Sequence, residues 1–218
     1  MAIHLHRDLD RLKKEILLLG SLVEDALNKA ILALRDRRAE LGQDVEDGDQ
    51  EVDDREIRIE EDCLKVLALH QPVANDLRFV VAVMKVNNDL ERVGDLAGNL
   101  AERAIFLAGR DAIEIPDQLE QMCDTVPTML RQAFDALIRL DTQVAREVLR
   151  EDEEIDALHA GFYHLVEERM REAPDQIQDW MQLLSASRYL ERIADLATNI
   201  AEDVIFMVDG DVVRHRAW

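Results

Sequence analysis

The sequence predicts an all-α protein made of two tandem antiparallel three-helix bundles related by an internal repeat. The first observation is that the segment at residues 91–106 recurs one hundred positions later, so the chain consists of two similar halves. The second is that only eight Gly and four Pro occur in 218 residues, mostly where helical periodicity stops, which favours a few long helices. The third is that no segment shows the alternating pattern of a strand.

The first half of the chain is predicted to contain three helices. Their expected spans are residues 8–38, 44–70 and 75–107. Gly42 marks the break between the first two, and Pro72 separates the second from the third because proline cannot continue a helix. Short joints between long helices favour antiparallel neighbours, so residues 1–110 are predicted to form the first three-helix bundle.

The second half repeats this plan after a linker at residues 109–116, which lies where a boundary between two repeats is expected. Its three helices are expected over residues 117–140, 142–172 and 175–208. Asp141 and Pro174 mark the joints, and Pro127 introduces a kink into the first of these helices. Residues 111–218 are therefore predicted to form the second bundle.

Each half carries one stripe of metal-ligand residue types within the repeated segment. The stripes consist of Glu91, Asp95, Asn99 and Glu102 in the first half, and of Glu191, Asp195, Asn199 and Glu202 in the second. At about 100° per residue, offsets of 4, 8 and 11 place each set within a sector of roughly 80° around the helix. Like charges at this spacing destabilise a helix by roughly 0.2–0.5 kcal/mol per pair, so the stripes favour a compensating cation.

The second helix of each half is also repeated, at an offset of 103 residues. The matching acidic pairs are Asp49 with Asp53, and Asp152 with Asp156. Continuing the same face leads to Glu56 in the first half and to His159 in the second. Oxygen ligands of this kind suit Mg²⁺, Mn²⁺, Ca²⁺ or iron, and also accept zinc, and the sequence does not choose among these ions.

The composition excludes several classes of function. A net charge of −21 argues against binding to nucleic acid or to an anionic membrane, because both need clustered Lys and Arg. Cys63 and Cys123 are sixty positions apart and neither belongs to a CxxC pair, so we expect no disulfide framework and a cytoplasmic location. No apolar signal core and no uncharged run of about 18 residues occurs, so we expect no membrane insertion.

Two alternatives to a metal-binding scaffold remain open. His159 follows Asp156 by three residues, as in ferritin-like di-iron bundles, so a di-iron carboxylate oxidase or a metal-storage bundle is one alternative. Such sites, however, need an acidic residue followed three positions later by histidine on two helices. The first half has Glu56 where the second half has His159. The other alternative is a helical adaptor that binds no metal. No nucleophile, base and orienting acid come together in the sequence, so we expect no enzymatic activity.

The segments LERVGDLAGNLAE and LERIADLATNIAE, with DQEVDDREIRIEEDCLKVLALHQPVANDLR before the first, closely resemble the PhoU family over nearly the whole chain. The signature of that family is an acidic ExxxD pair on the third helix of each bundle. The resemblance places this signature at Glu91 and Asp95, and again at Glu191 and Asp195. It implies multinuclear clusters of iron, zinc, manganese or magnesium ions, held by these pairs, by the second-helix aspartates, and by the Asn and Glu that follow on each stripe.

The resemblance also implies a function in phosphate regulation. Members of the family are cytoplasmic, often homodimeric accessory proteins of phosphate uptake. This chain is therefore expected to link the ATPase subunit of the phosphate ABC transporter to the phosphate-sensing histidine kinase. In that position it represses phosphate uptake and the phosphate-starvation (Pho regulon) response when phosphate is plentiful.

Overall fold

The computed structural model describes residues 2–210, and this range contains six long α-helices, a short 3₁₀ turn and no strand. The elements are α1 (Ala2–Asp36), α2 (Ala39–His70), α3 (Ala74–Ala108), α4 (Asp117–Arg139), α5 (Thr142–Glu172), η1 (Pro174–Gln176) and α6 (Ile177–Asp209). The predicted all-α class and the number of helices are confirmed. Pro127 lies inside α4, which continues through it as one helix.

The break between α1 and α2 does not lie at Gly42, so that prediction is wrong. The chain turns at Arg37, which adopts a left-handed φ of 55°, and α2 begins at Ala39. Gly42 is buried within α2, where a Cβ atom would lie 2.7 Å from Cγ1 of Ile105 on α3. Glycine is therefore required there for the close approach of two helices, and not for a turn.

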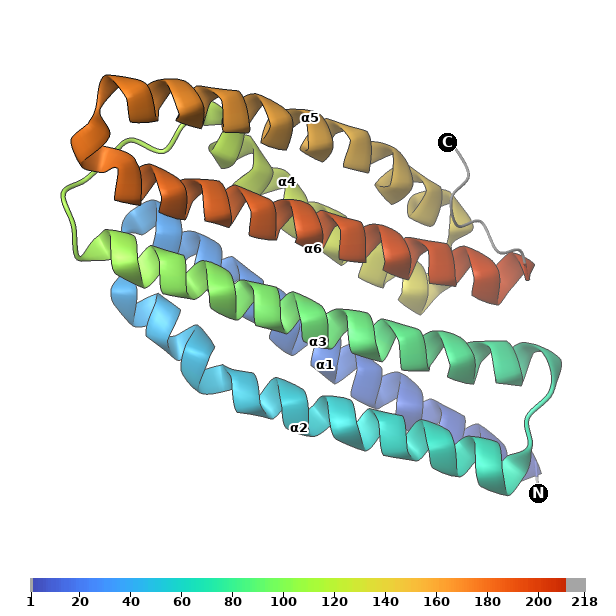
Figure 1. The fold of residues 1–218 in the computed structure, drawn as a ribbon. Helices are drawn as coiled ribbons and strands as arrows, with labels where there is room; N and C mark the ends of the chain where they lie inside the picture. Colours follow the sequence, from blue (N-terminus) through green and yellow to red (C-terminus); the bar gives the residue numbers. More distant parts are fainter. Residues whose placement is uncertain (1, 211–218) are drawn as a thin grey trace.

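Each half of the chain forms an antiparallel three-helix bundle, α1 to α3 in the first and α4 to α6 in the second (Figure 1). The bundles pack mainly through α3 and α6, which lie side by side and run in opposite directions. Lys85 of α3 and the buried Asp203 of α6 form an ion pair of 2.8 Å across this contact. The two helices that carry the predicted stripes are therefore the central helices of the molecule.

The repeat gives α3 and α6 equivalent buried faces. Leu90, Val93 and Leu100 of α3 are almost fully buried, and so are the matching side chains of α6. Gly94 lies close to α2, since an added Cβ would be 3.2 Å from Cγ1 of Val52. Burial of these apolar faces leaves the acidic face of each helix at the surface, beside the neighbouring second helix.

Two arginines hold the start of the link between the bundles. Arg37 donates hydrogen bonds to the backbone carbonyls of Leu107 at 2.6 Å and of Arg110 at 2.5 Å. The Arg110 guanidinium pairs with Asp179 in the first turn of α6. The predicted boundary between residues 110 and 111 lies in this link, and the division into domains 1–110 and 111–218 stays a prediction.

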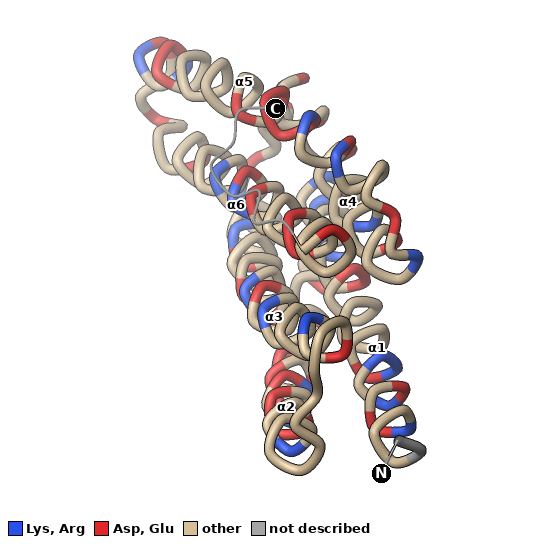
Figure 2. The backbone as a smooth tube through the Cα atoms, turned by 90° about the vertical axis from the view of Figure 1, so that its right-hand side faces the viewer, with Lys and Arg blue, Asp and Glu red and all other residues tan. Residues whose placement is uncertain are grey.

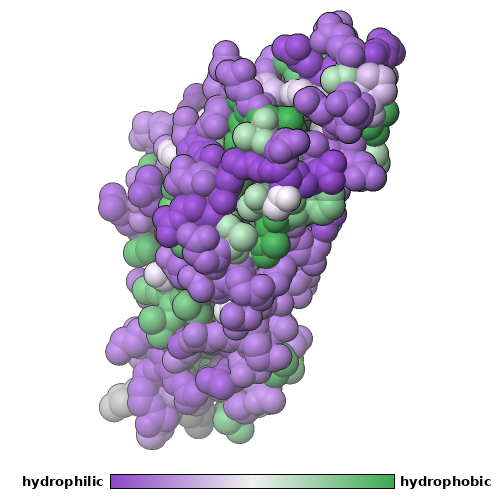
Figure 3. Space-filling model, turned by 90° about the vertical axis from the view of Figure 1, so that its left-hand side faces the viewer, coloured by the Kyte–Doolittle hydropathy of each residue, from purple (hydrophilic) through white to green (hydrophobic). Residues whose placement is uncertain are grey.

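The surface is mainly hydrophilic. On the side drawn in Figure 3, hydrophobic residues form small patches between larger hydrophilic areas. Asp and Glu recur along α2, while α3 and α6 carry both signs of charge (Figure 2). Within residues 2–210, every helix is either too polar or too short to cross a membrane.

Candidate functional site

Carboxylates of α2 and α3 come together in the first bundle. Burial raises the pKa of Glu91, and the neighbouring charges of Asp95, Glu56 and Asp53 raise it further. Burial also raises the pKa of Asp49, together with the charges of Asp53 and Asp95. Because charges must be close to shift one another's pKa, we define Asp49, Asp53, Glu56, Glu91 and Asp95 as the first carboxylate cluster.

The second bundle has an equivalent group on α5 and α6. Burial raises the pKa of Asp152 to about 6, assisted by the charges of Asp195, Asp156 and Glu191. The pKa of Glu191 is raised by burial and then by Asp195 and Asp156, and that of Asp195 by burial and then by Asp156. Asp152, Asp156, Glu191 and Asp195 form the second carboxylate cluster, and both clusters join the helices that the sequence analysis paired.

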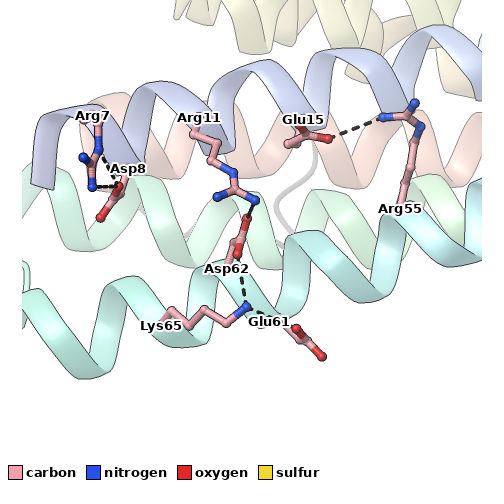
Figure 4. A network of polar contacts seen from close by, with 8 residues as sticks. All are labelled: Arg7, Asp8, Arg11, Glu15, Arg55, Glu61, Asp62 and Lys65. Carbon is pink, nitrogen blue, oxygen red and sulfur yellow. Dashed lines mark hydrogen bonds and ion pairs between the residues drawn. The ribbon is translucent and has the colours of Figure 1, made fainter. Parts of the chain in front are cut away.

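Other carboxylates of the first bundle are neutralised by basic residues. Figure 4 shows such pairs between α1 and α2, where Arg55 lies 3.4 Å from Glu15 and Arg11 lies 3.0 Å from Asp62. In contrast, no carboxylate of either cluster forms an ion pair with Lys, Arg or His among residues 2–210. Arg92 instead contacts Asp89, and Arg103 contacts Glu102. Arg92, Arg188 and Arg192 lower the pKa of nearby cluster carboxylates through their charge, but burial and carboxylate repulsion outweigh them, so the clusters keep a net negative charge.

The chemistry of the clusters fits a cation. Carboxylate oxygens on two facing helices are the donors that hard divalent and trivalent ions prefer. Among residues 2–210, however, no three His, Cys, Asp or Glu side chains are already arranged to hold a metal ion. Rotation of the side chains would be needed to bring their oxygens onto one ion.

The remaining members of the predicted stripes lie outside the two clusters. Asn99 donates its side-chain amide to the backbone carbonyl of Asp95 at 2.7 Å, and Glu102 pairs with Arg103. Asn199 and Glu202 line a groove of about 660 Å³ together with residues of α2 and α3. The antiparallel packing of α3 and α6 places the C-terminal half of the second stripe beside the first bundle. The role of these four residues as ligands stays a prediction.

Comparison with known proteins decides the family. A model of the PhoU domain matches residues 16–104 and again residues 119–204. The chain belongs to the PhoU family. It is 36% identical over 216 residues to the phosphate-specific transport system accessory protein PhoU homolog of Aquifex aeolicus, covering 97% of this chain and 96% of that protein. The PhoU protein of Escherichia coli is 30% identical over 208 residues, covering 95% and 86%.

Solved PhoU structures have the same fold. The crystal structure of PhoU from Pseudomonas aeruginosa matches with a TM-score of 0.92 and 34% identity, covering 94% of this chain and 99% of that one. The PhoU structure from Streptococcus pneumoniae matches with a TM-score of 0.85 and 31% identity, covering 96% and 99%. The predicted tandem of two three-helix bundles is therefore confirmed.

Glu56 is the one member of the PhoU carboxylate clusters that was not among the predicted ligands. Its position three residues after Asp53 on the same helix face was visible in the sequence. The orientation of its carboxylate could not be seen in the sequence, because it depends on a residue of another helix. Asn87 of α3 donates a hydrogen bond of 3.0 Å to the Glu56 carboxylate. In the second PhoU domain, His159 and Ser187 occupy the places of Glu56 and Asn87.

Proposed function

We propose that this chain is a metal-binding accessory protein of phosphate transport that works as a regulatory scaffold and not as an enzyme. The observation that carries the proposal is the presence of two carboxylate clusters on the facing helices of a PhoU fold, neither of which forms an ion pair within residues 2–210. The names of its relatives, which are accessory proteins of the phosphate-specific transport system, support the biological context.

The first cluster would hold its cation through Glu91, Asp95, Asp49 and Asp53, with Glu56 beside them. The second would use Glu191, Asp195, Asp152 and Asp156. A bound cation supplies the positive charge that these carboxylates lack, and iron, zinc, manganese and magnesium ions are the candidates. Each pair of facing helices would then be joined through side chains whose negative charges raise one another's pKa in the metal-free protein. Such a joint changes the stiffness and the charge of the face that carries it.

The regulatory part of the proposal places the chain between two proteins. In the cytoplasm, it would contact the ATPase subunit of the phosphate ABC transporter and the phosphate-sensing histidine kinase, and it would act as a homodimer. Cys63 and Cys123 are buried and free, which suits a reducing compartment. When phosphate is plentiful, the scaffold would hold the kinase in its repressing state and limit phosphate uptake.

The function is tested by deleting the gene in its host and measuring a phosphate-starvation promoter in high phosphate. We expect the promoter to remain active without the protein, and the wild-type chain to restore repression. A chain with Glu91, Asp95, Glu191 and Asp195 all changed to Ala should fail to restore it. The control variant is Glu61→Ala with Lys65→Ala, which removes an exposed ion pair of 3.1 Å outside both clusters and should restore repression. Normal repression in the deletion strain would refute the proposed role.

The absence of enzymatic activity has its own test. The chain is loaded with Fe²⁺ without oxygen and then mixed with air while oxygen consumption is recorded. We expect no repeated turnover, since the first domain has Glu56 where a di-iron oxidase would need a second histidine. Catalytic consumption of oxygen would instead favour the di-iron oxidase.

A further inference from the structure

The two PhoU domains differ at one structurally equivalent pair of positions beside the carboxylate clusters. In the first domain, the buried Asn87 donates to both the backbone carbonyl and the carboxylate of Glu56, each at 3.0 Å. In the second domain, the fully buried Ser187 lies 3.0 Å from Nδ1 of His159. Each third helix therefore fixes a residue of its second helix with a buried polar side chain, but the fixed residue is a carboxylate in one domain and an imidazole in the other.

The hydrogen bonds of Ser187 assign the tautomer of His159. The Ser187 hydroxyl donates its only proton to the backbone carbonyl of Leu184 at 2.9 Å. Towards His159 the Ser187 oxygen can therefore only accept, so Nδ1 of His159 carries the hydrogen. In a neutral imidazole the other nitrogen, Nε2, then holds the free lone pair. Burial and the charge of Arg188 lower the pKa of His159, which favours this neutral form.

His159 also lies at the edge of the second carboxylate cluster. It lies one helical turn beyond Asp156. The charge of Asp156 raises the pKa of His159 and also that of Glu191 and Asp195. Among the residues of the described range, none forms a hydrogen bond with Nε2 of His159. A histidine whose Nδ1–H is held by a neighbouring group, with Nε2 unengaged and an aspartate one helical turn away, has the hydrogen-bond arrangement found in metal-ligating histidines.

We propose that His159 is a nitrogen ligand of the second carboxylate cluster, so that the two domains bind different classes of metal ion. The inference rests on the proposed function, because it requires that a cation binds at the clusters. The first cluster offers only oxygen donors, which suit Mg²⁺, Mn²⁺ and Ca²⁺. The second offers an imidazole as well, which suits Zn²⁺ and Fe²⁺. Ser187 acts as a positioning residue that keeps Nε2 available.

The test is nitrogen NMR of the full chain labelled with ¹⁵N-histidine, first metal-free and then titrated with Zn²⁺ or Mg²⁺. The His159 signals are assigned by their loss in His159→Gln. In metal-free protein we expect a protonated Nδ1 and an unprotonated Nε2. Addition of Zn²⁺ should shift the Nε2 signal strongly, and Mg²⁺ should leave it in place. His164, exposed on the same helix, is the internal control and should not follow the same titration.

Calorimetric titration measures the affinity of each carboxylate cluster for metal ions. His159→Gln and Ser187→Ala should each weaken Zn²⁺ binding at the second cluster by about 10-fold or more and change Mn²⁺ binding at the first cluster less than about twofold. His164→Gln should have neither effect. Zn²⁺ binding that depends on Glu191 and Asp195 but leaves the His159 signals and affinity unchanged would overturn this inference alone. If neither Zn²⁺ nor Mn²⁺ binds to the wild-type chain, the proposed metal-binding function itself fails.

Discussion

Asp152 provides a quantitative test of the cost of burying a charged carboxylate within the second carboxylate cluster. Its pKa is raised from 3.8 to about 6, first by burial and then by the charges of Asp195, Asp156 and Glu191. The ionised carboxylate therefore destabilises the folded protein when no cation is bound. Asp152→Asn removes the charge and keeps the size of the side chain, so it should stabilise the metal-free protein at neutral pH.

The magnitude follows from the shift in pKa. Each unit corresponds to about 1.4 kcal/mol, which sets an upper limit of about 3 kcal/mol for this carboxylate. The side chain is only half-buried, so screening by solvent reduces the expected gain to about 1 kcal/mol. Because the pKa of Asp152 is higher in the folded state than in the unfolded state, the folded protein stays protonated there up to a higher pH. The wild-type chain therefore loses this stability as the pH rises from about 4 to about 6.

The assay is urea unfolding in the presence of a chelator at about pH 3, below the unfolded pKa, and at about pH 8. The free energy of unfolding of Asp152→Asn should equal that of the wild type at the lower pH and exceed it by about 1 kcal/mol at the higher pH. Glu154→Gln, an exposed position on the same helix, is the control and should change little at either pH. A gain that is independent of pH, or a loss of stability at the higher pH, would refute the reasoning.

Three further predictions concern the scaffold. Gly20→Ala should lower the free energy of unfolding by roughly 1–3 kcal/mol, because its Cβ would lie 2.2 Å from the Phe134 ring. Gly161 has open space around it, so Gly161→Ala should raise the free energy of unfolding by about 0.5–1 kcal/mol. If urea unfolding showed that both variants change the free energy of unfolding in the same direction, the described packing would be contradicted. Asp141 accepts hydrogen bonds from the backbone N–H groups of Gln143 at 2.9 Å and Val144 at 3.2 Å, so Asp141→Ala should cost about 1 kcal/mol in thermal unfolding. An unchanged melting temperature would show that this cap contributes nothing.

Much of the fold could be predicted because periodicity and prolines mark long helices directly. The repeat at Glu91 and Glu191 also identified the acidic face of the third helix in each half, whereas the contact between these two helices came only from the structure. The start of α2 could not be predicted in the same way. Gly42 has the residue type of a break, but its lack of a side chain serves helix contact, whereas the actual turn uses Arg37, a residue with no turn preference.

The candidate site was predictable only as far as single helices and their repeats determine it. The ExxxD pairs and the second-helix aspartates raise one another's pKa across facing helices, and their role as metal ligands stays a prediction. The position of Asn199 and Glu202 in a groove shared with the first bundle follows from the antiparallel packing of α3 against α6, which the pattern of one helix does not contain. The orientation of Glu56 likewise depends on Asn87, a residue of another helix.

The metal content of the chain purified without chelator tests the central claim most directly. Elemental analysis should find metal in the wild-type protein. Glu91→Ala with Asp95→Ala should lose the metal of the first cluster only, and Glu191→Ala with Asp195→Ala that of the second only. The native mass, measured on the same samples, should stay the same in all three proteins. A wild-type chain without metal, or double variants that keep the full wild-type content, would contradict the assignment of the carboxylate clusters as metal sites.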